Sequence, residues 1–123
     1  MALSTTPTTQ SLYTAPPIEP SPLALDFRDS LGRVWGFPYG HLLNYQLDKN
    51  PNAELHAATP PDRLSLSFST HDVLLLGWRL SKVLDPLDRA RIASLIARLP
   101  RYANLEKEKA FIAEIIVKPA QKD

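Results

Sequence analysis

The chain has 123 residues, enough for one domain, and its 14 Lys and Arg against 13 Asp and Glu give a formal charge of +1. This balance argues against a protein dominated by nucleic acid or an anionic membrane, although a local basic patch is compatible with it. The sequence contains no cysteine, which excludes disulfides, thiolate catalysis and cysteine-type zinc sites. No apolar run approaches the roughly 20 residues that span a bilayer, and no signal-peptide pattern is recognisable. We therefore expect a cytoplasmic protein without a membrane partner.

Residues 1–22 differ in composition from the rest of the chain. They contain five of the 12 prolines, many Ser and Thr residues, and one charged residue, Glu19. Such a segment cannot bury enough apolar surface to offset the entropy lost on ordering. We therefore expect a disordered or extended Pro/Thr/Ser-rich tail over residues 1–22, followed by a single domain over residues 23–119.

Alternating apolar residues predict a first hairpin. The alternation covers residues 23–27 and 33–37, and a period of two indicates strands with one buried face. Gly32 lies in the intervening turn, where a short hairpin loop requires positive φ. Pro38 lacks an amide hydrogen and should end the second strand. Residues 39–47 fit either a strand or one or two helical turns, and we favour a short turn over 38–41 followed by a strand.

A second hairpin is predicted from Arg63 to Leu80, after a long loop over residues 48–62. Its first strand alternates apolar and polar residues, and residues 69–72 are short polar side chains that favour a tight turn. Its second strand, Val73–Leu80, is apolar on both faces. Such a strand should be covered on both sides, which places it centrally in the sheet.

The C-terminal half predicts one helix and a last strand. Asp85 suits the N-cap and Pro86 the first helical position, and apolar residues then follow at helical spacing up to Pro100, so we expect a helix over 86–99. Residues 110–118 fit a helix or a strand, and their β-branched run favours a strand. The sequence therefore predicts an α+β domain: an antiparallel sheet of four to five strands with one main helix packed on it.

Three segments also carry a resemblance. FPYGHL, FSTHDV and GWRL, the last followed by the proline-containing helix, resemble small bacterial proteins of unknown function over about residues 24–118. The resemblance implies a bacterial, cytoplasmic origin and contributes nothing about chemistry.

Candidate catalytic residues are few. His41, His56 and His71 stand in no metal-ligand spacing, and the sequence has no glycine-rich phosphate loop and no GxSxG motif. His71 and Asp72 are adjacent at a predicted turn, and turn chemistry alone explains them. We expect no catalytic residue, no metal site and no cofactor.

Candidate binding residues form two groups. Arg91 and Arg98 share one flank of the predicted helix, with Arg101 close by. Guanidinium groups in such a row either bind the phosphate groups of a nucleic acid or only keep this flank of the helix in contact with water. Trp78 and Arg79 lie on the central strand. Trp78 shares a face with Leu74 and Leu76, which favours a place in the core. Arg79 on the opposite face suits either the end of the sheet or an interface, where Trp and Arg often concentrate binding energy.

The leading functional hypothesis is a non-enzymatic binding or assembly module. Its partner is another protein or a second copy of the chain, which would bind at a sheet edge or around Trp78 and Arg79. The alternative is a nucleic-acid-binding protein that uses the arginine flank. An enzyme ranks third because no set of nucleophile, base and orienting group can be assembled from the sequence.

Overall fold

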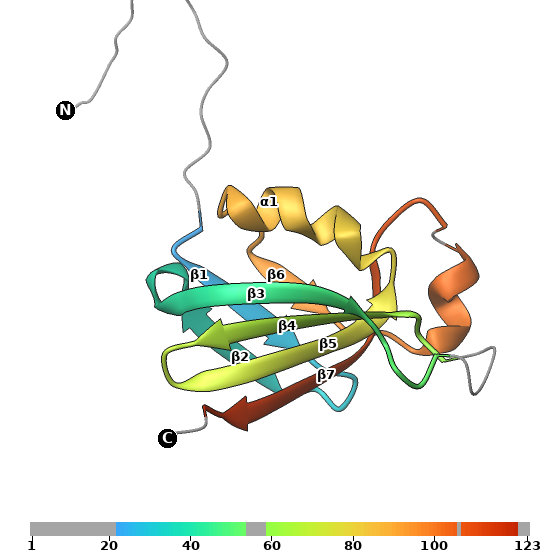
Figure 1. Cartoon of the computed structure of the whole chain (residues 1–123), viewed down its shortest axis with the longest axis horizontal. Coiled ribbons are helices and arrows are strands. Elements are labelled where there is room, and N and C mark those ends of the chain that lie inside the picture. The colour runs from blue at the N-terminus through green and yellow to red at the C-terminus, as the bar shows by residue number, and fades with distance from the viewer. Residues whose placement is uncertain (1–21, 54–58, 106, 121–123) are drawn as a thin grey trace, which may run out of the picture.

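The fold consists of two β-sheets with a short helix along one side (Figure 1). The structure is a computed structural model and describes residues 22–53, 59–105 and 107–120. One sheet has three strands in the order β2-β1-β6, with bounds Ala24–Arg28 for β1, Val34–Pro38 for β2 and Ser94–Ile96 for β6. The other has four strands in the order β3-β4-β5-β7, with bounds Leu42–Lys49, Asp62–Phe68, His71–Trp78 and Phe111–Pro119.

Short helical elements occupy the connections. They are α1 (Leu84–Asp88) and the 3-10 turns η1 (Tyr39–His41), η2 (Leu80–Val83) and η3 (Pro100–Leu105). The predicted α+β class, with largely antiparallel strand pairing and a helix in the C-terminal half, is confirmed. The described residues form seven strands in two sheets, where one antiparallel sheet of four to five strands was expected. The tail expected over residues 1–22 lies outside the described residues, except for residue 22.

Both predicted hairpins are confirmed. β1 pairs antiparallel with β2, and Gly32 in their turn has φ of +86°. The Asp29 carboxylate stabilises this turn by accepting hydrogen bonds from the amides of Leu31 and Arg33, at 3.0 and 2.9 Å. β4 pairs antiparallel with β5. The two ambiguous segments also form strands, β3 and β7, and η1 supplies the short turn expected before β3.

The core lies between the two sheets. Phe27 and Phe37 from the three-stranded sheet meet Phe68 of β4, and the Phe37 and Phe68 rings stack with centroids 4.5 Å apart. Other fully buried side chains are Leu25, Leu64, Leu66, Val73, Leu75, Leu80 and Phe111. The inward positions of both hairpins therefore form one continuous apolar layer, as their alternation indicates.

β5 is a central strand, but the expectation that both of its faces are covered was wrong. Val73 and Leu75 face the core with no exposed surface. Leu74, Leu76 and Trp78 point to the opposite side of the sheet and are only half-buried. In Figure 1 no helix or strand of the described residues lies in front of β4 and β5, and at the end of this face Trp78 packs against the buried Phe111 of β7.

The prediction of a helix over residues 86–99 was also wrong. α1 ends at Asp88, and Ala90 adopts a left-handed φ of 52°, which stops helical continuation. Residues 94–96 instead form β6, which runs parallel to β1 with Leu95 opposite Phe27. The apolar spacing fitted a helix, but pairing with β1 decides the local structure, since tertiary context overrides a weak propensity. Asp85 consequently lies in the first turn of α1 and Val83 is the N-cap.

The helix α1 lies beside β3 and β6 at one border of the two sheets (Figure 1). Its Leu87 is buried in the shared core. No helix in the described part of the chain is long and apolar enough to cross a membrane.

Candidate interaction surface

The outer face of the four-stranded sheet carries a partly buried apolar stripe. We call this surface the open face; its apolar members are Leu74, Leu76 and Trp78 of β5 and Ile116 of β7. Leu74 lies directly opposite Ile116 in the register, so the two side chains are neighbours on this face. Figure 1 shows this sheet in front, with the three-stranded sheet behind it.

Polar and charged residues lie next to the stripe, as the rows of cross-strand neighbours show. One row runs from Asp48 through Arg63 and Leu76 to Glu114, and another from Asn44 through Ser67 and Asp72 to Lys118. The Arg63 guanidinium lies 3.5 Å from the Asp48 carboxylate. A shallow hollow of about 420 Å³ opens among residues that include Ser65, Leu74 and Ile116. An apolar centre with a charged border is the usual composition of a protein interface.

The Nε–H of Arg63 lies beneath this surface without a hydrogen-bond partner among the described residues. A buried donor left unpaired is costly, and native structures contain few of them. Arg63 also lines the hollow, so the unmet donor belongs to the same surface as the apolar stripe.

The structure places Trp78 and Arg79 side by side but gives them different surroundings. The Trp78 ring lies at the end of the open face and meets Phe111 edge-on, with centroids 5.9 Å apart. The Arg79 guanidinium turns inward: its Nε donates to the Lys109 carbonyl at 2.7 Å and its Nη2 to the Ala103 carbonyl at 3.2 Å. Arg79 thus holds η3 and the segment before β7 beside the end of β5.

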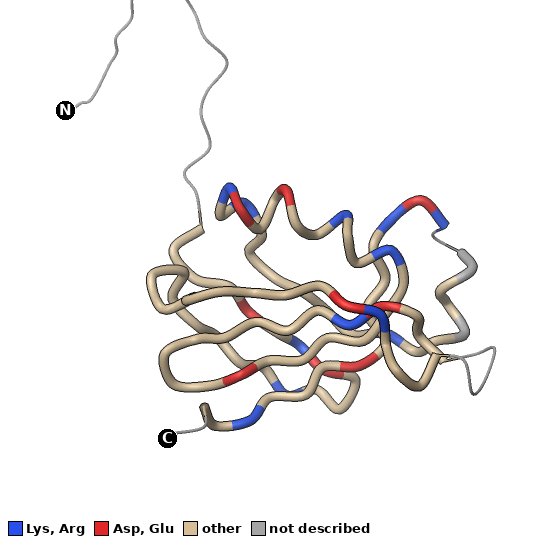
Figure 2. The backbone as a smooth tube through the Cα atoms, in the orientation of Figure 1, with Lys and Arg blue, Asp and Glu red and all other residues tan. Residues whose placement is uncertain are grey.

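The three predicted arginines do not share a helix flank. Arg91 is exposed in the segment between α1 and β6, and Arg98 follows β6. The Arg98 guanidinium lies over two rings, 5.5 Å from the centre of Phe111 and 5.8 Å from that of Tyr102. Arg101 belongs to η3, and its side chain lies outside the described structure. In Figure 2, basic and acidic residues lie close to one another around α1 and in the segment before β7.

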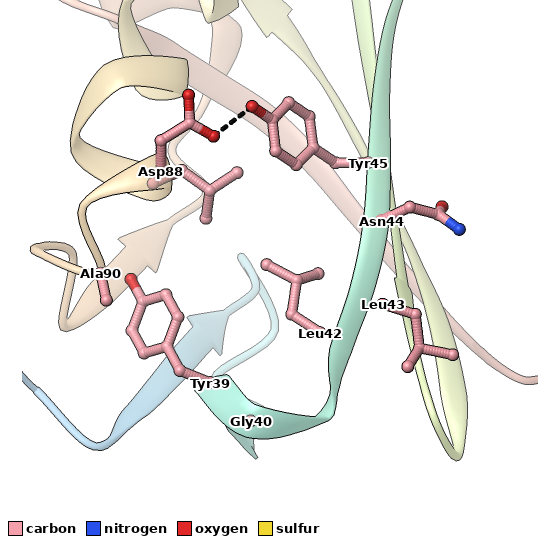
Figure 3. A pocket seen from close by; sticks show the side chains of 9 residues that line it. Tyr39, Gly40, Leu42, Leu43, Asn44, Tyr45, Asp88 and Ala90 are labelled. Atoms are coloured by element: carbon pink, nitrogen blue, oxygen red, sulfur yellow. Dashed lines mark hydrogen bonds between the residues drawn. The ribbon is translucent and has the colours of Figure 1, made fainter.

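A pocket of about 440 Å³ separates β3 from α1. Tyr39, Leu42 and Tyr45 point into it from η1 and β3, whereas Leu43 and Asn44 point away (Figure 3). The Tyr45 hydroxyl donates a hydrogen bond across the gap to the Asp88 carboxylate of α1. The sequence did not reveal this pocket, because β3 and α1 meet through Tyr45 and Asp88, which are 43 positions apart in the chain.

The environment of this pocket raises the pKa of both tyrosines. The hydrogen bond to Asp88 raises the pKa of Tyr45 above the usual 10.0, since ionisation would place a phenolate against a carboxylate. Burial raises the pKa of Tyr39. Both hydroxyls therefore stay protonated near neutral pH. The Tyr45 hydroxyl bonds to Asp88 and so joins β3 to α1, and the Tyr39 hydroxyl bonds to the backbone of Ile92 and so joins η1 to the segment after α1.

The histidines have separate surroundings. His41 is exposed in η1, and His56 lies outside the described residues. The His71 ring packs beside Phe37 and Trp35, with centroids 5.4 and 6.0 Å away. Among the described residues, no group of three His, Asp or Glu side chains converges as a metal site would require.

Comparison of the chain with protein-family models, with curated proteins and with solved structures found no significant match.

Proposed function

We propose that this protein is a non-enzymatic binding or assembly module that recognises another protein chain through the open face and the adjoining strand β7. The observation that carries the proposal is the partly buried apolar stripe of Leu74, Leu76, Trp78 and Ile116 on the outer face of the four-stranded sheet. These four side chains are only partly buried, and apolar surface that stays accessible within a polar frame marks interaction sites. Burying this stripe would remove apolar area from water, which is the main driving force of association.

The type of surface favours a protein partner. Trp78 is a large ring that loses little conformational entropy on binding, and such residues dominate interface energetics. The neighbouring Asp48, Arg63, Asp72 and Lys118 offer both signs of charge within a few strand positions. A mixed border of this kind gives specificity towards a complementary protein surface.

The alternative of nucleic-acid binding has less support. It depended on Arg91 and Arg98 lying on one helix flank, and residues 94–96 form a strand instead. The chain's formal charge of +1 provides little of the non-specific phosphate attraction on which such binding relies. An enzymatic role is supported least, because the acidic and phenolic groups of the pocket between β3 and α1 are engaged with each other and with backbone.

The test compares two introduced charges on opposite sides of the molecule. Leu74→Glu charges the open face, and Val34→Glu is the matched control, since Val34 is 58% exposed on the three-stranded sheet. Sedimentation of the purified protein and affinity capture from a host extract would reveal self-association or a different partner. We expect Leu74→Glu to weaken the association, because Leu74 lies directly beside Ile116 in the register, and Val34→Glu to retain it. Equal behaviour of parent and both variants in every assay would reject the proposal.

A further inference from the structure

Strand β7 is an outer strand with most of one edge exposed. It has nine residues and pairs with β5 on one side. On its other side, the backbone hydrogen bonds and bridges of the described residues are confined to Ile112, which forms an isolated bridge with Ala97 and whose carbonyl accepts a hydrogen bond from the Arg98 amide at 2.9 Å. On this edge, away from β5, no strand of the described residues lies next to β7 from residue 113 to Pro119. Long apolar edge strands act as templates for pairing with another chain, and natural proteins usually block them.

One hydrogen bond fixes which residues of β7 direct their backbone groups to that edge. The Ala120 amide donates to the Thr70 carbonyl at 3.0 Å, and the register continues without a shift from His71–Pro119 to Leu76–Glu114. In an antiparallel ladder, hydrogen-bonded and non-hydrogen-bonded pairs alternate. Glu114, Ile116 and Lys118 therefore bond to β5, whereas Ile115 and Val117 direct their N–H and C=O groups outward. Pro119, which has no N–H, occupies an outward position, as this alternation requires.

On the open face of β7, side chains of opposite charge stand at equal distances along the strand on either side of Ile116. Glu114 precedes Ile116 by two positions and Lys118 follows it by two, and both charged side chains are exposed. A twofold axis through Ile116 would set Glu114 of each copy opposite Lys118 of the other. It would also set the two Ile116 side chains against each other. Opposite charges and β-branched residues are favourable cross-strand pairs.

We propose that two copies of this chain pair through antiparallel β7 strands about a twofold axis at Ile116, forming one continuous sheet of both four-stranded sheets. Ile115 of each copy then exchanges backbone hydrogen bonds with Val117 of the other, which uses the outward groups. The inference rests on the proposed assembly function and names its partner. Centring the axis on Ile115 or Val117 would retain backbone pairing but would place neither Glu114 nor Lys118 opposite an opposite charge.

The experiment exchanges the two charges in the full-length protein and measures the monomer–dimer constant by sedimentation equilibrium. Glu114→Lys and Lys118→Glu each place like charges opposite one another twice in the dimer, so each should weaken dimerisation about tenfold or more. The double variant E114K/K118E restores both pairs and should return the constant to within about threefold of the parent. Glu108→Lys, an exposed position before β7, is the control for net charge and should have no effect.

A backbone variant tests the edge itself. Val117→Pro removes an outward N–H without removing a hydrogen bond to β5, so it should abolish dimerisation while thermal melting still reports a folded protein. A dimer that is insensitive to the charge exchange, or one that survives Val117→Pro, overturns the pairing but leaves assembly through the open face in place. A monomeric parent that captures a different protein through Leu74 also overturns the pairing and supports the proposed function. A monomer that captures nothing rejects both.

Discussion

The phenol of Tyr39 makes two hydrogen bonds to the backbone of Ile92: it donates to the carbonyl at 2.6 Å and accepts from the amide at 3.2 Å. These residues are 53 positions apart, and Ile92 lies in the irregular segment between α1 and β6. Backbone groups outside a ladder still need partners when they are withdrawn from water. One side chain therefore satisfies both groups of Ile92 and joins η1 to the segment that leads into β6.

Removing this hydroxyl should destabilise the fold. Tyr39→Phe keeps the ring but leaves both backbone groups of Ile92 without these bonds, and we expect a loss of about 1–3 kcal/mol in the free energy of unfolding. Urea denaturation at neutral pH measures it. Tyr45→Phe is the comparison, since its hydroxyl bonds an exposed carboxylate and its removal should cost less. An unchanged midpoint for Tyr39→Phe would show that water replaces the phenol at Ile92.

The same two tyrosines predict a loss of stability in alkali. Their folded-state pKa values lie above the 10.0 of the unfolded chain, so the folded state holds its phenolic protons more tightly. This contribution is fully present below pH 10.0 and is lost as pH rises through the raised pKa values. Urea midpoints between about pH 8 and pH 11 should fall less steeply for Tyr45→Phe than for the parent. Parallel curves would mean that Asp88 does not influence Tyr45.

A side chain at Gly77 should destabilise the fold. The register of β5 with β7 shifts between Leu76 and Gly77, and a Cβ at Gly77 would stand 3.0 Å from the carbonyl carbon of Phe111 and closer still to its oxygen. Gly77→Ala should therefore cost about 1–3 kcal/mol or more, because backbone must move. Gly36→Ala is the matched control: its Cβ would meet only the Asp26 side chain, at 3.0 Å, and the cost should stay within about 1 kcal/mol. Similar melting temperatures for the two variants would refute the close approach.

The sequence predicts those elements whose structure is determined by residues close together in the chain, and it fails where a distant segment determines the structure. The turn at Gly32 and the hairpin from Arg63 to Leu80 follow from residue types and a period of two, and both were predicted correctly. β6 could not be predicted, because the spacing of Ile92, Leu95 and Ile96 fits a helix and only pairing with β1 reveals a strand. The arginine flank inferred from that helix is therefore absent.

The candidate surface was only partly predictable for the same reason. Trp78 was a binding candidate by residue type, although the face that it shares with Leu74 and Leu76 favoured the core, and the structure places it partly buried on the open face. For Leu74 and Leu76 the sequence predicted a buried position, because a strand that is apolar on both faces is expected to be covered on both sides. The sequence alone cannot show whether a second layer of structure covers the outer face. The Glu114–Ile116–Lys118 pattern is visible in the sequence, but its meaning requires the register with β5 and the knowledge that β7 is an outer strand.

The two faces of β5 should respond differently to truncation. Leu75 has no exposed surface and faces the core, so Leu75→Ala should cost about 2–5 kcal/mol through lost burial and the cavity left behind. Leu76 is half-buried on the open face, where water can occupy the vacated space, so Leu76→Ala should cost clearly less, about 1 kcal/mol. Denaturant midpoints at a protein concentration that keeps the chain monomeric measure both. If the two losses were equal, Leu76 would be covered by a layer that the described residues do not include, and the surface proposed for binding would already be occupied.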